Sequence, residues 1–173
     1  QDQEYVINMI DTPGHVDFSG RVIRSLRAID GAVVVCDAVE GIMTQTETVT
    51  RMALEERVRP VLFINKVDRL IKELRLTPEK MQAQLAEVVS TFNQLVDTYA
   101  EPEYKEKWKV SIQDASVTFG SAKDRWAINT DLMKERGITF KDVIDAYTDE
   151  KLPELVEKAP LADAVLGMVV KHH

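Results

Sequence analysis

Two short, fully apolar runs restrict the fold of this chain more than any other feature. Residues 32–36, rich in β-branched side chains, and residues 61–64 contain no polar group, as is typical of strands covered on both faces. Further strands are predicted at residues 5–10 and 116–119, and amphipathic stretches of helical periodicity lie between the strands. This alternation predicts an α/β fold with a mainly parallel sheet flanked by helices.

The composition fits a single globular domain. The chain has 173 residues, of which 45% are hydrophobic, enough for one sizeable core. Its net charge of −7 disfavours broad contact with phosphate backbones or anionic membranes. The one cysteine, Cys36, lies inside an apolar run and is expected to be a buried thiol. We therefore expect a cytoplasmic monomer that does not contact membranes.

A polar cluster follows the first predicted strand, at the position where open α/β sheets bind their ligands. Residues 11–15 read Asp-Thr-Pro-Gly-His. The Asp11 carboxylate can hold a Mg²⁺ ion through water, and Gly14 lets a backbone N–H approach a terminal phosphate. The alternative is a simple strand-to-helix turn with an aspartate cap. The cluster points to phosphate binding.

A second cluster, Asn65-Lys66-Val67-Asp68, follows the run at 61–64. The Asp68 carboxylate can accept both the ring N–H and the exocyclic amino group of guanine, a pair of donors that adenine lacks. Asn65 can bond the base edge, while the Lys66 stem covers the base face. The alternative is an Asn/Asp turn after a buried strand. This cluster favours guanine over adenine.

A third cluster, Gly-Ser-Ala-Lys at residues 120–123, follows the last predicted strand. Its small residues allow a backbone N–H just after Ser121, that of Ala122 or of its neighbour, to reach the carbonyl oxygen of guanine. Taken alone this is a weak signal, but its place after the other two clusters makes it informative.

The ordered set of clusters resembles the last three of the five motifs of the GTP-binding protein family. His15 narrows the resemblance to translational GTPases. Further matches narrow the resemblance to the translocation factors of archaea and eukaryotes, and in particular to the archaeal kind. These matches are residues 16–19, 37–41 and 119–122 and the Trp-Ala pair at 126–127. The resemblance covers essentially the whole chain.

This resemblance implies a P-loop GTPase-like G domain that binds GTP, GDP and Mg²⁺ and hydrolyses GTP to drive ribosomal translocation. His15 would orient the attacking water. The implied partners are ribosomal RNA and the stalk proteins of the ribosome. The implied nucleotide and Mg²⁺ contacts are Asp11, Gly14, Asn65, Lys66, Asp68, Ser121 and Ala122.

The phosphate-binding loop of this family, Gly-x-x-x-x-Gly-Lys-Ser/Thr, is not found in the sequence. We expect this loop, its central strand and the first switch segment to belong upstream of residue 1. The sequence thus predicts a partial, N-terminally truncated G domain over residues 1–173. Because the loop supplies many of the phosphate contacts, we expect the chain alone to be a poor GTPase or an inactive one.

The stretch between Asp68 and Ser121 is longer than one helix and one strand require. We therefore expect a helical insertion that forms a small subdomain at about residues 72–112. An alternative function follows, in which the chain is a non-catalytic module that docks a ribosomal stalk partner through this insertion. A third possibility, an adenine-specific ATPase, is disfavoured by Asn65, Lys66 and Asp68.

Overall fold

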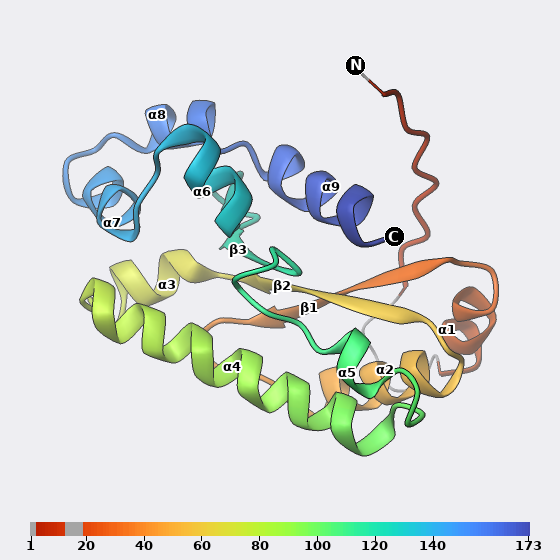
Figure 1. Ribbon diagram of the computed structural model, residues 1–173. Coiled ribbons are helices and arrows are strands. Elements are labelled where there is room, and N and C mark those ends of the chain that lie inside the picture. Colours follow the sequence, from red (N-terminus) through yellow and green to blue (C-terminus); the bar gives the residue numbers. More distant parts are fainter. Residues whose placement is uncertain (1–2, 13–18) are drawn as a thin grey trace.

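The computed structural model of the chain describes residues 3–12 and 19–173. Within these ranges four strands form one sheet in the order β1-β2-β3-β4 (Figure 1). The first three strands are parallel, and β4 is antiparallel to β3. The strands are β1 (Gly31–Asp37), β2 (Arg59–Asn65), β3 (Val117–Ser121) and β4 (Trp126–Ile128). The expected α/β fold with a mainly parallel sheet is confirmed.

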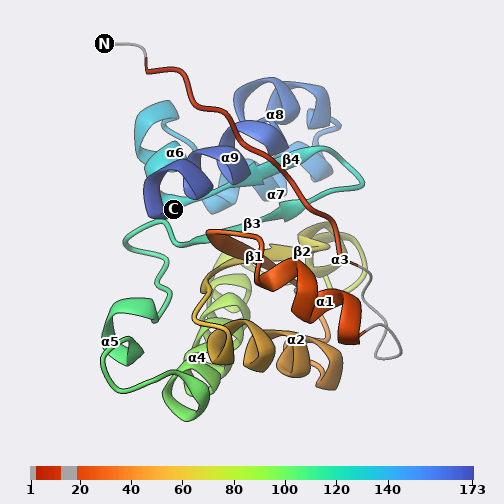
Figure 2. The ribbon, with the colours of Figure 1, turned by 90° about the vertical axis from the view of Figure 1, so that its right-hand side faces the viewer.

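Helices cover both faces of the sheet (Figures 1 and 2). The last helix, α9, packs against β2, β3 and β4, whereas α2 packs against β1, β2 and α4 on the other side. The helices of the described ranges are α1 (Ser19–Leu26), α2 (Thr44–Glu55), α3 (Val67–Lys72), α4 (Pro78–Tyr99), α5 (Lys105–Trp108), α6 (Thr130–Arg136), α7 (Phe140–Thr148), α8 (Leu152–Lys158) and α9 (Leu161–His172).

The strand predicted at residues 5–10 is wrong. In the structure residues 3–12 form no strand, and Val6 is 91% exposed. A β-rich sequence becomes a strand only where a neighbour satisfies its backbone N–H and C=O groups, and this segment has no partner strand within the described ranges. One face of β1 is also partly uncovered, since Val33 is 37% and Val35 is 53% exposed. The burial on both faces expected for residues 32–36 is therefore wrong.

The helix α4 belongs to the main core. Thr77 caps it by accepting a hydrogen bond from the Lys80 amide, and Pro78 occupies its first turn. Its apolar face is buried in the same cluster as the sheet residues Leu62 and Phe119. The buried residues of that face are Met81, Leu85, Val88, Phe92 and Val96. The helix contacts α2, α5 and α7, and the subdomain expected at about residues 72–112 stays a prediction.

A smaller cluster fixes α1 against α2. Val22 and Leu26 of α1 are buried with Ala53 and Val58.

Among the described residues, no helix is both long and apolar enough to cross a membrane.

We predict that Phe92→Ala lowers the free energy of unfolding by about 3–5 kcal/mol, because it opens a cavity in the main core. Phe92 is fully buried. The measurement is the urea midpoint followed by circular dichroism. Gln94→Ala changes an exposed position of the same helix and should shift the free energy by no more than about 0.5 kcal/mol. Equal effects of the two changes would contradict the placement of α4.

Candidate functional site

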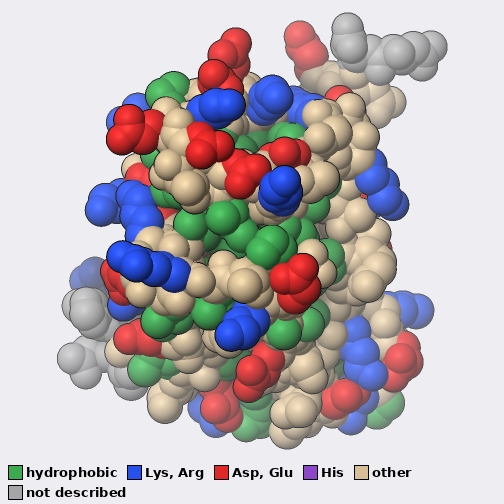
Figure 3. Space-filling view, turned by 90° about the vertical axis from the view of Figure 1, so that its left-hand side faces the viewer, with side chains coloured by type: hydrophobic (Ala, Val, Ile, Leu, Met, Phe, Trp, Pro, Cys, Tyr) green, Lys and Arg blue, Asp and Glu red, His purple; other side chains and the backbone are tan. Residues whose placement is uncertain are grey.

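The candidate site lies where the three parallel strands end. Asp37, Asn65 and Ser121 are the last residues of β1, β2 and β3. Asp37 lies opposite Asn65 in the sheet register, so these two strands end at the same level. Figure 3 views the molecule from the side of α3 and α7, toward which the strands point, and shows Lys, Arg, Asp and Glu side chains around a hydrophobic centre. Parallel strands gather their loops at this edge.

The side chain of Asn65 connects two of the predicted clusters. Its Oδ1 accepts a hydrogen bond from the Ala122 amide at 2.9 Å and another from the Lys66 amide at 2.8 Å. The structure therefore brings together the loops after β2 and β3. It also shows that the Ala122 amide is used within the protein, which leaves the neighbouring amide of Lys123 as the candidate donor to a guanine carbonyl oxygen.

The loop after β2 contains a residue whose backbone is in the left-handed conformation. Lys66 has φ of 63° and ψ of 31°, in the left-handed region, and stands at the start of α3. Such a conformation costs a non-glycine residue free energy, which the bond from its amide to Asn65 helps to offset. Two residues on, Asp68 is buried in the first turn of α3.

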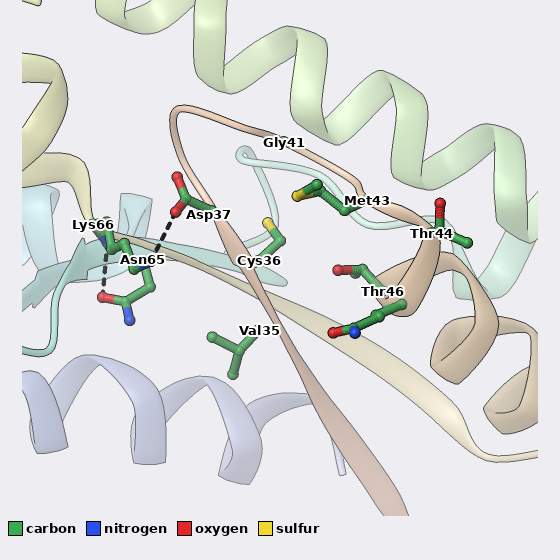
Figure 4. A pocket seen from close by; sticks show the side chains of 10 residues that line it. Val35, Cys36, Asp37, Gly41, Met43, Thr44, Thr46, Asn65 and Lys66 are labelled. Atoms are coloured by element: carbon green, nitrogen blue, oxygen red, sulfur yellow. Dashed lines mark hydrogen bonds and ion pairs between the residues drawn. The ribbon is translucent and has the colours of Figure 1, made fainter. Parts of the chain in front are cut away.

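A hollow of about 520 Å³ opens beside Asn65 and Lys66. Figure 4 shows its lining side chains, with Asp37 at the end of β1 pointing toward Lys66. The other lining residues are Val35 and Cys36 of β1, Gly41 and Met43 of the β1–α2 loop, and Thr44, Gln45 and Thr46 in the first turn of α2. The predicted burial of Cys36 is confirmed, and burial raises the pKa of its thiol to about 12. A thiol with such a pKa stays protonated near neutral pH and is a poor nucleophile.

The glycine of the Gly-Ser-Ala cluster is required by a close approach of two backbones. A Cβ atom on Gly120 would lie 2.3 Å from the Trp126 carbonyl oxygen and 2.6 Å from the Ala127 Cα. No side chain fits there, because β3 and β4 pair at this position.

A hydrogen-bond chain holds the turn after Ser121. The Ser121 hydroxyl accepts from the Asp124 amide at 3.1 Å, and the Tyr147 hydroxyl donates to Asp124 Oδ2 at 2.6 Å. The Trp126 indole N–H in turn donates to the Tyr147 oxygen at 2.7 Å. Burial, with the bond to Asp124, raises the pKa of Tyr147 above its usual range. Sequence reasoning missed Asp124 and Tyr147, because their contact joins segments 23 residues apart.

The phosphate side of the predicted site is only partly described. Asp11 is exposed, whereas Gly14 and His15 lie outside the described residues. Among the described residues no group of three or more His, Cys, Asp or Glu side chains could hold a metal ion. Mg²⁺ commonly binds through one or two carboxylates together with water and nucleotide phosphates, and the exposed Asp11 carboxylate fits that donor set.

The sequence matches known proteins along nearly all of its length. The family model described as the elongation factor Tu GTP binding domain matches residues 1–171. The chain is 87% identical over its full length to elongation factor 2 of Cenarchaeum symbiosum and covers 24% of that protein. Over 96% of the chain it is 61% identical to elongation factor 2 of Aeropyrum pernix, and over 98% it is 59% identical to that of Methanocaldococcus jannaschii. It spans 23% of each of these two relatives.

We predict that Asn65→Ala increases the hydrogen-exchange rate of the Ala122 amide at least about tenfold, since that amide loses its acceptor. Asn65→Asp keeps an oxygen at the same place and should keep the amide protected. Exchange followed by ¹⁵N-resolved NMR measures both variants. An unchanged rate in the alanine variant would show that Asn65 does not hold the loop.

We predict a second effect at alkaline pH. Because the folded protein keeps the proton on Tyr147, this group stabilises the fold below about pH 10, the usual tyrosine pKa, and loses that contribution as the pH rises further. Tyr147→Phe should lower the free energy of unfolding by about 1–3 kcal/mol at neutral pH, because the buried Trp126 N–H loses its acceptor. The same change should reduce the loss of stability above about pH 10. Tyr5→Phe, at an exposed position, should leave both properties unchanged. Urea midpoints between pH 7 and pH 11 measure both effects; an undiminished decline in the Tyr147 variant would contradict this assignment.

Proposed function

Because the chain belongs to the family of elongation factor Tu GTP-binding domains, we propose that it binds GTP and GDP as part of an elongation factor 2. In that protein it hydrolyses GTP to drive translocation on the ribosome. The observation that carries the proposal is the bridge from Asn65 to the Lys66 and Ala122 amides, which joins the loops after β2 and β3. To these two loops we assign guanine recognition.

Guanine recognition is assigned to the two loops that Asn65 joins. The Asp68 carboxylate accepts the ring N–H and the exocyclic amino group of the base. The stem of Lys66 covers the base face, and a backbone amide of the loop after Ser121 approaches the carbonyl oxygen. Adenine presents neither this pair of donors nor this acceptor, so the site discriminates against ATP.

Phosphate binding and hydrolysis are assigned to residues near the N-terminus. Asp11 would hold Mg²⁺ through water, and Gly14 would let its backbone N–H approach the γ-phosphate. An ion held there would supply positive charge that offsets the charge of the phosphates. His15 orients the water for in-line attack, since an imidazole can accept or donate a proton near neutral pH.

The helix after His15 moves when the γ-phosphate contact is lost, so that hydrolysis becomes a change of shape. The 173 residues contain no Gly-x-x-x-x-Gly-Lys-Ser/Thr loop, and we expect the chain by itself to hydrolyse GTP poorly. The partners are ribosomal RNA and stalk proteins, and the place of action is the cytoplasm, where translation occurs.

One feature favours the alternative of a docking module. The rings of Tyr104 and Trp108, at α5, stack with their centroids 4.4 Å apart, and both side chains are partly exposed. Partly exposed aromatic rings are common in protein interfaces. This second role would be supported if the nucleotide-free chain bound a stalk protein and the Trp108→Ala variant did not.

We predict that Asp68→Asn weakens GDP binding at least about 100-fold, because two charge-assisted hydrogen bonds are lost. The same change should tighten binding of xanthosine diphosphate, whose base carries a carbonyl oxygen where guanine has its amino group. The measurement uses a chimera, in which this chain replaces the matching stretch of the full-length Cenarchaeum symbiosum relative. Asp149→Asn, at an exposed position, is the control. An unchanged preference for GDP would contradict the role of Asp68.

We predict that His15→Ala in the same chimera lowers ribosome-stimulated GTP hydrolysis at least about 100-fold and leaves GDP affinity nearly unchanged. His172→Ala, a histidine substitution in α9, should hydrolyse GTP at the parent rate. Phosphate release measures the hydrolysis. A His15 variant that works at the parent rate would remove this residue from the mechanism.

A further inference from the structure

Asp37 is held in place by the turn that follows β1. Its Oδ1 accepts hydrogen bonds from the Val39 amide at 2.8 Å and the Glu40 amide at 3.2 Å. The side chain is 12% exposed. This carboxylate therefore has one fixed orientation, with Oδ1 turned to the backbone and Oδ2 turned away from it.

The second carboxylate oxygen, Oδ2, faces the guanine-selective loop. Asp37 Oδ2 lies 3.0 Å from the Lys66 ammonium nitrogen and 3.6 Å from an Arg69 nitrogen (Figure 4). This oxygen is shielded from water, and its contact with Lys66 is an ion pair rather than a well-directed hydrogen bond. Arg69 is also engaged by Glu73 at 3.0 Å. Lys66 is thus the nearer cation to Asp37 Oδ2.

The charge state of Asp37 agrees with this pairing. Burial would raise the pKa of its carboxyl, yet the contact with Lys66 and the amides of Val39 and Glu40 outweigh burial and hold the pKa below the ordinary value. Asp37 is accordingly ionised at neutral pH, where Lys66 is positively charged.

We propose that Asp37 is a positioning residue for the guanine base, because it holds the Lys66 side chain where the lysine stem can cover the face of the base. This inference rests on the proposed function. An exposed lysine has many rotamers, and fixing its side chain costs conformational entropy. The Lys66 side chain is 53% exposed. Because two amides already fix the Asp37 carboxylate, its ion pair with Lys66 restricts the lysine side chain before the nucleotide binds. Less conformational entropy is then lost on binding.

The sign of the expected effect separates this role from simple electrostatics. GDP is an anion, so removal of a negative charge from the site would by itself strengthen its binding. If Asp37 positions Lys66, its neutralisation must instead weaken binding. Glu40 provides the matched control, because its backbone amide, and not its carboxylate, contacts Asp37.

The test is a double-mutant cycle in the chimera, with fluorescent GDP as the probe. Asp37→Asn keeps an oxygen for the two amides and should raise the Kd about tenfold, the equivalent of about 1.4 kcal/mol. Lys66→Met should raise the Kd at least as much, and the double variant no further than Lys66→Met alone, since both changes remove one interaction. Glu40→Gln should leave the Kd unchanged or lower it.

Base analogues show which contact is lost. Inosine diphosphate lacks the amino group that Asp68 binds, so loss of base-face cover should weaken GDP and inosine diphosphate by the same factor. Urea midpoints establish that each variant is folded. Asp37→Ser, whose hydroxyl can also accept from the turn, repeats the test if the asparagine variant unfolds.

Unchanged or tighter GDP binding by Asp37→Asn, or effects of the two substitutions that simply add, would overturn this proposal alone. A folded parent chimera that binds no guanine nucleotide would instead overturn the proposed function, and this inference with it. The two failures are therefore distinguishable in one experiment.

Discussion

The hydrogen bond from the Ala122 amide to Asn65 Oδ1 joins two loops that lie 57 residues apart in the sequence. The same oxygen accepts from the Lys66 amide and supports a left-handed backbone there. One side chain thus sets the position of both loops to which we assign the guanine contacts. Without this side chain, the two loops would lose the hydrogen bonds that join them.

Each joined loop has a further support from outside the three sequence clusters. Asp37, at the end of β1, pairs with Lys66 on the first loop. Tyr147, from α7, binds Asp124 on the second. Within the third cluster itself, Gly120 allows β4 to lie close behind that loop. The edge of the sheet is therefore ordered before ligand binds, which lowers the conformational cost of binding.

The parts of this arrangement that the sequence predicts are those set by neighbouring residues. Apolar runs ending in polar clusters located the ends of β2 and β3, since strand burial and turn chemistry are local properties. Residues 5–10 have a strand-like sequence, but a strand requires a partner, and local composition does not supply one. The contacts of Asp37 with Lys66 and of Tyr147 with Asp124 join distant segments, so spacing alone could not reveal them.

The central claim is that the edge formed by the ends of β1, β2 and β3 selects guanine nucleotides. The most direct measurement is displacement of fluorescent GDP, with Mg²⁺ present, from the chimera and from the chain alone. We predict that GTP and GDP, but not ATP, displace the probe from the chimera, and that the chain alone binds much more weakly. Equal displacement by ATP, or no binding of the probe by a folded chimera, would contradict the account.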